Sequence, residues 1–180
     1  MSKIVVGIRH GEAWHNILFD SLGQHAFTDY NDTTLTAKGM NQASRSGGHD
    51  IQPELVLVSP LMRTLQTADI LYKNVPKIAL ECLKEYPQHT ELCNRRSPKS
   101  LLVKLYPNVD FTDLKTEEQM WPNHTPENDM KTIQAFIEQQ EARVIAIVSH
   151  STWLKFCING TITSEPELEH CHLYYLNRFN

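Results

Sequence analysis

Three short runs of aliphatic residues constrain the fold of this chain more than any other feature. They cover Ile4–Ile8, Leu55–Val58 and Val144–Val148, and each is nearly continuous rather than alternating. Because a strand that is covered on both faces has no polar side, this pattern favours parallel strands buried between helices. Lys77–Leu80 and Leu173–Leu176 are further candidate strands, the second of them close to the end of the chain.

Helical segments are predicted between these strands. Serine or threonine side chains can accept hydrogen bonds from the free N–H groups of a first turn, and proline fits there because it has no N–H group. On that basis Ser59, Ser97 and Thr125 are expected to cap helices, each directly before a proline. The five expected helices run from Thr36 to about Ser46, from Pro60 to Tyr72, from Pro98 to Leu105, from Thr125 to about Glu141, and from Ser151 to Ile158.

The alternation of strands with helices of this size predicts an α/β fold, a three-layer α/β/α sandwich with a mainly parallel central sheet. The stretches Leu18–Thr34 and Tyr86–Asn94 carry no comparable signal, so both are expected to be long loops, which in compact domains are often functional. With 180 residues and no internal repeat, the chain is expected to form a single domain over residues 1–180.

The composition restricts the partners. A formal net charge of −4 argues against nucleic acid or an anionic membrane surface as the main partner, so an anion would need a local basic pocket. Four cysteines without a CxxC pair fit neither a zinc site nor a dense disulfide framework. No apolar stretch approaches the ~20 residues that span a bilayer, and no signal-peptide core follows Met1. We therefore expect a cytoplasmic, reduced and soluble protein.

Cationic and imidazole side chains follow the three main runs at the points where the strands end. Arg9 and His10 follow the first run, Arg63 lies shortly after the second, and His150 follows the third. Because ligands bind beyond the carboxyl ends of the strands in open α/β sheets, we expect these four side chains to share one crevice. Two guanidinium groups and two imidazoles near helix N-termini suit a compact dianion such as a phosphate monoester. Each residue alone has a structural explanation; their joint placement favours a site.

Four motifs in order along the chain resemble those of one family. Arg9-His10-Gly11-Glu12 resembles the signature of the histidine phosphatase superfamily, also called phosphoglycerate-mutase-like. Leu35–Ala43 is similar to the Leu-Thr-x-x-Gly-x-x-Gln-Ala element of that family, Ser59–Ala68 to its second-arginine motif, and Ser149–Ser151 to its second-histidine motif. The resemblance covers most of the chain and implies the α/β fold inferred above.

Finer features resemble the short fungal and plant mutase-like phosphatases of this superfamily. They are His15-Asn16, Tyr106–Phe111 with the later Trp121, and Cys93–Ser97. In that subgroup a Cys-Asp-x-Arg-Arg type of segment follows the catalytic acid. This chain is one residue shorter there and has Asn94 in place of the aspartate, so the roles of Arg95 and Arg96 stay open.

The resemblance implies a division of roles among the site residues. His10 would accept the phosphoryl group, Arg9 and Arg63 would hold its oxygens, and His150 would donate a further hydrogen bond to the transition state. Fixed cations would then stand in for a metal ion, so neither a metal nor a cofactor is expected. The other candidates for substrate binding are Gly11, Glu12, Asn16, Ser151, Arg95 and Arg96.

The departing alkoxide needs a proton, and a carboxylic acid with a raised pKa can supply it. Glu85 resembles the proton donor of the family by its place between the second-arginine and second-histidine motifs, with Glu81 and Glu91 as alternatives. Glu12, beside the nucleophile, is expected either to form part of the pocket wall or to support a residue that does. Strand alternation would put His170 and His172 on one face, which could imitate a metal pair, but no third ligand lies at a recognisable spacing.

The sequence favours a phosphomonoesterase that acts on a small phosphorylated substrate through a phosphohistidine on His10 and releases inorganic phosphate. A cofactor-dependent phosphoglycerate mutase is one alternative, but such mutases carry an Arg-His-Tyr-Gly-like segment after the acid, where this chain has Tyr86–Thr90. A non-catalytic module that binds phosphate ligands is the other, although no catalytic residue is replaced. Metabolites, nucleotides, sugar phosphates and phosphoproteins stay open as substrates, and so does the oligomeric state.

Overall fold

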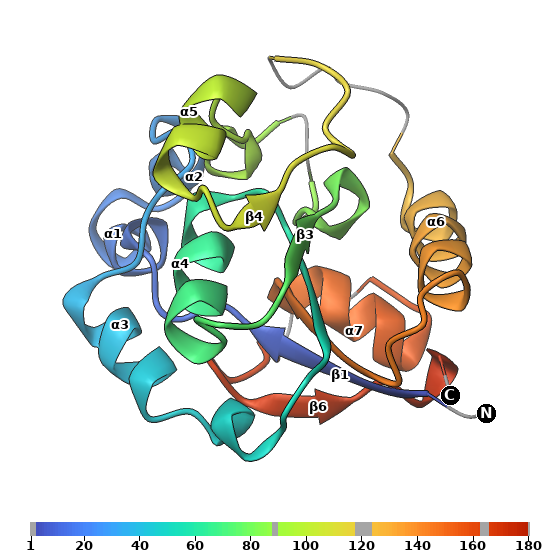
Figure 1. Ribbon diagram of the computed structural model, residues 1–180. Coiled ribbons are helices and arrows are strands. Elements are labelled where there is room, and N and C mark those ends of the chain that lie inside the picture. The colour runs from blue at the N-terminus through green and yellow to red at the C-terminus, as the bar shows by residue number, and fades with distance from the viewer. Residues whose placement is uncertain (1–2, 88–89, 118–123, 163–165, 180) are drawn as a thin grey trace.

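The computed structural model describes residues 3–87, 90–117, 124–162 and 166–179 (Figure 1). It confirms an α/β architecture around a mostly parallel sheet. Within the described residues the sheet has six strands in the order β4-β3-β2-β5-β1-β6. β6 is antiparallel to β1, and the other neighbouring pairs are parallel. The strands are β1 (Ile4–Arg9), β2 (Leu55–Val58), β3 (Lys77–Ala79), β4 (Val109–Asp110), β5 (Val144–Ser149) and β6 (Leu173–Tyr175).

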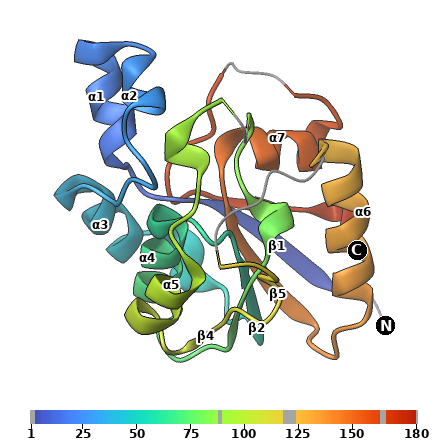
Figure 2. The same cartoon turned by 90° about the horizontal axis from the view of Figure 1, so that it is seen from above.

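Helices cover both faces of this sheet. The α-helices are α1 (Trp14–Leu22), α2 (His25–Thr28), α3 (Ala37–Ser44), α4 (Met62–Leu71), α5 (Lys99–Leu105), α6 (Pro126–Glu138) and α7 (Ser151–Asn159). Short 3-10 turns are η1 (Gly47–Asp50), η2 (Glu81–Leu83), η3 (Leu92–Asn94) and η4 (Asn177–Phe179). Figure 2 shows the strands between α4 and α5 on one side and α6 and α7 on the other, which is the expected three-layer arrangement.

The two faces of the sheet bury separate apolar clusters, and this explains the continuous apolar runs. Val5 and Ile145 belong to the cluster that includes residues of α6 and α7. Their neighbours Val6 and Ala146 belong to the cluster that includes residues of α4 and α5. Because successive side chains of a strand point to opposite faces, both positions of each pair must be apolar. No helix of the described segments is long and apolar enough to cross a lipid bilayer.

The central strands bring three polar segments to one edge of the sheet. β1 and β2 both pair in parallel with β5, with Arg9 opposite Ser149 and Val58 opposite Val148. The chain therefore leaves all three strands at the same edge. The segments that begin with His10, Ser59 and His150 meet there, as the sequence predicts.

Two loop predictions need correction. The prediction of a long loop over Leu18–Thr34 is wrong, because this stretch contains the end of α1 and the whole of α2. Neither helix has serine, threonine or aspartate at its N-cap position; at the start of α1 the side-chain oxygen of Asn16 instead accepts the N–H of Ala13 at 2.9 Å. The predicted loop Tyr86–Asn94 holds η3, and Gln88 and His89 lie outside the described residues.

Several helix ends also differ from the predictions. α4 begins at Met62 rather than Pro60, because Oδ1 of Asp32 accepts the N–H of Met62 at 2.8 Å in place of the expected Ser59 cap. α5 has Pro98 rather than Ser97 at its cap position, α6 ends at Glu138 rather than near Glu141, and α3 ends at Ser44. The caps at Thr36 and Thr125 are confirmed, since their side chains accept the N–H groups of Gly39 and Asn128.

Candidate active site

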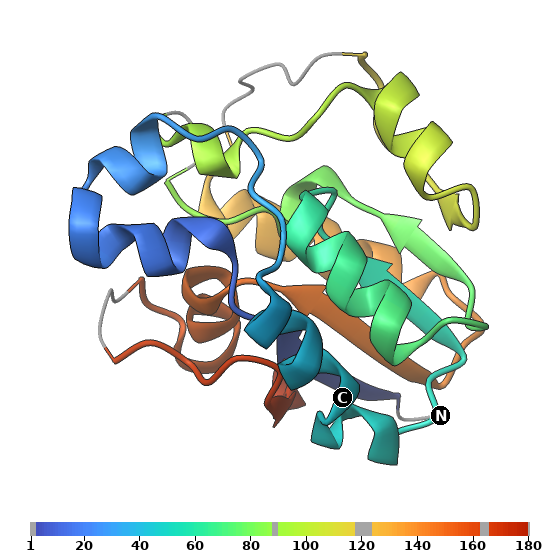
Figure 3. The ribbon, with the colours of Figure 1, turned by 90° about the vertical axis from the view of Figure 1, so that its left-hand side faces the viewer.

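A pocket of about 420 Å³ opens at the edge of the sheet where β1, β2 and β5 end. Five of the predicted site residues line it: Arg9, His10, Asn16, Arg63 and Glu85. Residues of α1, α2 and η3 complete the wall, and Figure 3 shows α1 and α2 in blue beside the yellow-green segment that holds η3. The pocket is therefore built from strand ends and from the two segments that were predicted to be loops.

His10 lies in this pocket as a neutral imidazole. Its Nδ1 lies 2.7 Å from the carbonyl oxygen of Gly11, and because a carbonyl only accepts, Nδ1 must carry the proton. The lone pair is then on Nε2. His10 is 2% exposed, and burial, followed by the positive charge of Arg63, holds its pKa well below the usual value. A neutral imidazole with an unprotonated Nε2 is a competent nucleophile.

Two buried arginines flank His10, each held by its terminal nitrogens. Arg63 donates from Nη1 to the Cys93 carbonyl at 2.6 Å and from Nη2 to Oδ1 of Asn94 at 2.7 Å. Arg9 donates from Nη1 to the Leu168 carbonyl and from Nη2 to Glu167 at 2.6 Å. These bonds fix both guanidinium groups while leaving their Nε–H groups for another partner.

His150 lies next to His10. The centroids of its ring and of the His10 ring are 5.1 Å apart, and the planes are tilted by 62°. Its Nε2 lies 2.8 Å from Oγ of Ser59, the residue that was expected to cap α4. Burial lowers the pKa of His150 well below its usual value. His150 is fully buried and does not itself line the pocket.

Unpartnered polar atoms gather at this place. Five buried side-chain N or O atoms of the described residues lack a hydrogen-bond partner, and three of them are Nε of Arg9, Nε of Arg63 and Nδ1 of His150. The other two belong to Glu81 and Lys84, which form an ion pair with each other at 2.8 Å. A buried donor without a partner costs about 1–3 kcal/mol. Because the three remaining atoms belong to residues beside the neutral His10, the arrangement suits a bound oxyanion.

Glu85 supplies a carboxyl group at the N-terminus of α7. Its oxygens accept the N–H groups of Thr152 at 3.0 Å, Trp153 at 3.1 Å and Tyr86 at 3.0 Å. Burial raises the pKa of this carboxyl, while the three N–H groups and the charge of Arg63 oppose the rise. The net shift is upward, as a proton donor requires.

The two alternative acids differ in their surroundings. Glu81 is bound by Lys84 at 2.8 Å and by Arg96 at 2.6 Å, and it does not line the pocket. Glu91 does line the pocket, and burial raises its pKa as well. The structure therefore places Glu85 and Glu91, but not Glu81, on the wall of the pocket that holds His10.

Four predicted substrate-binding residues are engaged elsewhere or do not line the pocket. Glu12 accepts a hydrogen bond from Thr36 and pairs with Lys38, both at 2.8 Å. Oγ of Ser151 accepts the N–H of Leu168 at 3.0 Å. Arg96 is buried and pairs with Glu81, and Arg95 is not among the lining residues.

Gly11 has a packing role that the sequence did not indicate. A Cβ at Gly11 would overlap the carbonyl oxygen of Gly39 in α3, and a Cβ at Gly39 would overlap that of Glu12. The two glycines therefore let the segment after β1 lie directly on α3. Asn16 lines the pocket, and because its oxygen already accepts the N–H of Ala13, its amide nitrogen is the group that can donate to a ligand. Trp121 lies outside the described residues.

Sequence reasoning missed three residues around His10. His15 lines the pocket, with its ring 6.0 Å from that of His10. Nδ1 of His170 donates to the His10 carbonyl at 2.8 Å. Asn94 holds Arg63, as described above. The resemblance to the Cys-Asp-x-Arg-Arg segment pointed to this stretch but to the arginines rather than to Asn94. Nothing in the sequence connects His170 with His10.

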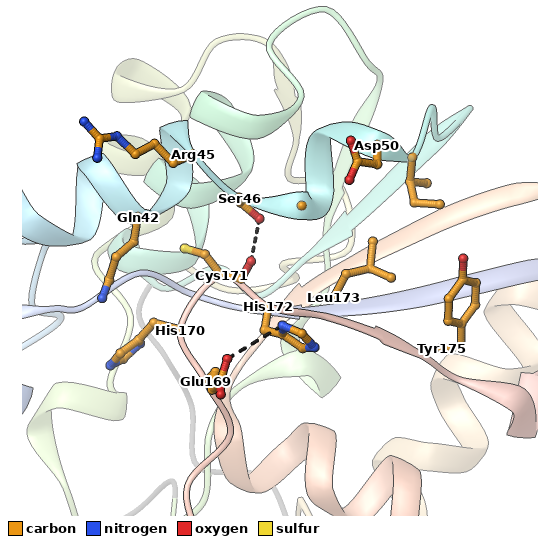
Figure 4. Close-up of a pocket in the computed structure, with 12 residues that line it drawn as sticks. Gln42, Arg45, Ser46, Asp50, Glu169, His170, Cys171, His172, Leu173 and Tyr175 are labelled. Atoms are coloured by element: carbon orange, nitrogen blue, oxygen red, sulfur yellow. Dashed lines mark hydrogen bonds and ion pairs between the residues drawn. The ribbon is translucent and has the colours of Figure 1, made fainter.

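A second hollow of about 440 Å³ lies between the α3–η1 segment and the residues around β6 (Figure 4). His170 and His172 both line it, but the expected strand alternation is wrong, because β6 begins at Leu173 and Cys171 has a positive φ of 57°. In its lining His172 and Glu169 form an ion pair at 3.8 Å, and the Ser46 hydroxyl donates to the Cys171 carbonyl. None of the buried unpartnered atoms in the described chain belongs to its lining, so it lacks the anion-binding character of the first pocket.

The fold and the first pocket together define an α/β protein with a neutral histidine and two arginines at the carboxyl edge of a parallel sheet. The chain matches the family model described as the histidine phosphatase superfamily (branch 1) over residues 5–176, and it therefore belongs to that superfamily.

Curated relatives come from plants and fungi. A phosphoglycerate mutase-like protein of Arabidopsis thaliana is 25% identical, with 84% of this chain and 72% of the relative covered. Phosphomutase-like protein 3 of Candida albicans is also 25% identical, with 79% of this chain but 55% of the relative covered. The chain thus spans little more than half the length of this second relative.

Solved structures share the fold at low sequence identity. A phosphoserine phosphatase from Entamoeba histolytica, in complex with phosphoserine, superposes with a TM-score of 0.61 at 21% identity, covering 96% of this chain and 89% of the other. The alpha-ribazole phosphatase of Shigella flexneri gives a TM-score of 0.58 at 22% identity, covering 94% and 88%.

Proposed function

We propose that this chain is a phosphomonoesterase that transfers the phosphoryl group of a small phosphate monoester to Nε2 of His10 and then to water. The observation that carries the proposal is the neutral His10 with its unprotonated Nε2 beside three buried polar groups that lack partners. A phosphoryl group at His10 would offer an acceptor to the two Nε–H groups, and also to Nδ1 of His150 if that atom carries the proton. Membership of the histidine phosphatase superfamily supports the same chemistry.

In the first step a P–N bond forms to Nε2 while the P–O bond to the leaving group breaks. The Nε–H groups of Arg9 and Arg63 would donate to the equatorial oxygens, where charge is spread in the transition state. If the Ser59 hydroxyl donates to Nε2 of His150, Nδ1 of His150 carries a proton and becomes a third donor. Fixed donors of this kind require neither a metal ion nor a cofactor.

Glu85 would give its proton to the departing oxygen in the same step. In the second step its carboxylate would take a proton from water, the water oxygen would bond to phosphorus, and the P–N bond would break. The products are inorganic phosphate and the free His10. The raised pKa of Glu85 and its place on the pocket wall support this role, and Glu91 is the alternative donor.

The remaining expectations form part of this proposal. Residues 1–180 would act as one catalytic domain in the cytoplasm, without nucleic-acid or membrane partners. The four cysteines are free and buried, which fits a reducing compartment.

Hydrolysis of p-nitrophenyl phosphate in the presence of EDTA tests the proposal. Wild type should turn over without added metal, and His10→Ala should lose at least ~1000-fold in kcat. Lys38→Ala is the matched control, because Lys38 pairs with Glu12 outside the pocket. No turnover by folded wild type, or equal turnover by His10→Ala, would contradict the proposal.

A further inference from the structure

We propose that the pocket selects monophosphates whose leaving group presents an aromatic or apolar surface and carries no second negative charge. This inference rests on the proposed phosphatase function and adds the class of substrate to it. Two independent features of the pocket support it, a row of rings and the sign of the charges around the leaving group.

The row of rings leads outward from the nucleophile. The His15 ring lies 6.0 Å from His10, the Phe27 ring lies 5.7 Å from His15, and the Phe19 ring lies 5.2 Å from Phe27 at an angle of 23°. All four side chains line the pocket. The row therefore forms one continuous aromatic wall from the reacting atom to the rim.

The outer end of this wall is left open to solvent. Phe19 is 46% exposed although it stacks on Phe27, so part of its ring has no partner within the described structure. Removal of apolar surface from water lowers the free energy of the system, and stacking stabilises aromatic rings further. A leaving group with a flat or apolar body would cover Phe19 once its phosphate lies at His10.

The charges of the wall act against a second anion. Among the described lining residues the permanent cations are Arg9 and Arg63, and both face the phosphoryl group in the proposed mechanism. The carboxyl groups on the wall belong to Glu85, Glu91 and Glu167. The segments 88–89, 118–123 and 163–165 contain no lysine or arginine in the sequence, so they add no such cation. Because Glu167 pairs with Arg9 and Glu85 is protonated in the proposed first step, a carboxylate or second phosphate on the leaving group would meet the Glu91 carboxyl group. It would find no permanent cation among the described lining residues beyond the two arginines that hold the phosphoryl group.

The test compares three substrates whose leaving groups are all alkoxides, so that leaving-group chemistry does not decide the result. They are 2-phenylethyl phosphate, ethyl phosphate and 3-phosphoglycerate, assayed in EDTA. We expect kcat/KM to be about tenfold higher for 2-phenylethyl phosphate than for ethyl phosphate, and at least ~10-fold lower for 3-phosphoglycerate than for ethyl phosphate.

Variants of residues on the pocket wall test whether the wall causes these differences in kcat/KM between substrates. Phe19→Ala should lower the ratio of kcat/KM for 2-phenylethyl phosphate to that for ethyl phosphate by about fivefold. Leu22→Ala is the matched control, because Leu22 lies on the same helix, is 38% exposed and does not line the pocket. Glu91→Gln should raise the ratio of kcat/KM for 3-phosphoglycerate to that for ethyl phosphate by about threefold. The ratio cancels any loss that is common to both substrates.

The outcomes distinguish failure of this inference from failure of the proposed function. If p-nitrophenyl phosphate is hydrolysed in a His10-dependent way but 3-phosphoglycerate is the best of the three alkyl substrates, the substrate class is wrong and the phosphatase function stands. Equal losses on both substrates in Phe19→Ala would also overturn the inference. Absence of any His10-dependent turnover would overturn both.

Discussion

Replacement of Arg63 by lysine separates the geometry of the site from its charge. The guanidinium of Arg63 holds the Cys93 carbonyl and Asn94 with its two terminal nitrogens and leaves Nε for the ligand. An ammonium group keeps the positive charge, but it is a single donor centre. It can reach the protein acceptors or the phosphoryl oxygens, but not both at once.

The expected losses of kcat and of stability follow from the hydrogen bonds that a lysine at position 63 cannot make. Loss of one fixed donor to the transition state costs about 10²–10³ in kcat, or about 3–4 kcal/mol. Loss of one charge-assisted hydrogen bond inside the protein costs about 1.5–3 kcal/mol of unfolding free energy, which is roughly 3–12 °C in Tm for a chain of this size.

The assay is kcat on p-nitrophenyl phosphate, with thermal unfolding measured in parallel. Arg96→Lys is the matched control, because Arg96 is also buried and binds several carbonyl groups as well as Glu81, but does not line the pocket. It should lose stability and keep its kcat at temperatures where it is folded. If Arg63→Lys keeps more than about a third of the wild-type kcat, or if Arg96→Lys loses as much kcat as Arg63→Lys, Arg63 does not act as a fixed donor to the transition state.

Three further predictions concern single side chains. Glu85→Gln should lower kcat about 100-fold or more on ethyl phosphate and remove the alkaline limb of the pH profile for that substrate. It should lower kcat on p-nitrophenyl phosphate far less, since nitrophenolate leaves without a proton. Equal losses of kcat on the two substrates would argue against Glu85 as the acid. Burial lowers the pKa of His170 in the folded protein from its usual value to about 4. Between pH ~6.5 and 4 the unfolded chain therefore binds a proton at His170 that the folded protein does not, and the free energy of unfolding decreases as pH falls through this range. His170→Asn should therefore remove up to about 3 kcal/mol of the change in unfolding free energy over that window, and denaturant titrations with parallel pH dependence in both proteins would refute this. Gly39→Ala should destabilise the fold by about 3 kcal/mol or more, because its Cβ would overlap the Glu12 carbonyl, and an unchanged Tm would contradict that packing.

The sequence predicted the parts of the site that depend on strand order. The continuous apolar runs specified strands covered on both faces, and the residues that follow them, His10 and His150, indeed meet at one edge. Such patterns are local, and the rule that ligands bind at the carboxyl ends of parallel strands converts them into a position in space.

Other parts depend on contacts between distant segments, which no local pattern records. α1 and α2 lack cap signals and are held by the stacking of Phe19 on Phe27. Ser59 has the sequence context of a helix cap, but its hydroxyl binds His150, and Asp32 takes over the capping of α4. His170 reaches His10 across 160 residues of sequence.

The central claim is that Nε2 of His10 carries the phosphoryl group during turnover. The direct measurement is to mix wild type with ³²P-labelled substrate, quench within milliseconds, and map the label by peptide mass spectrometry and ³¹P NMR. Because Nδ1 of His10 is occupied by its hydrogen bond to Gly11, the label should be acid-labile, stable in alkali, and attached to Nε2 of His10. Label on Nδ1 or on another residue, or hydrolysis without any trapped phosphoprotein under conditions that trap a fast intermediate, would contradict the account.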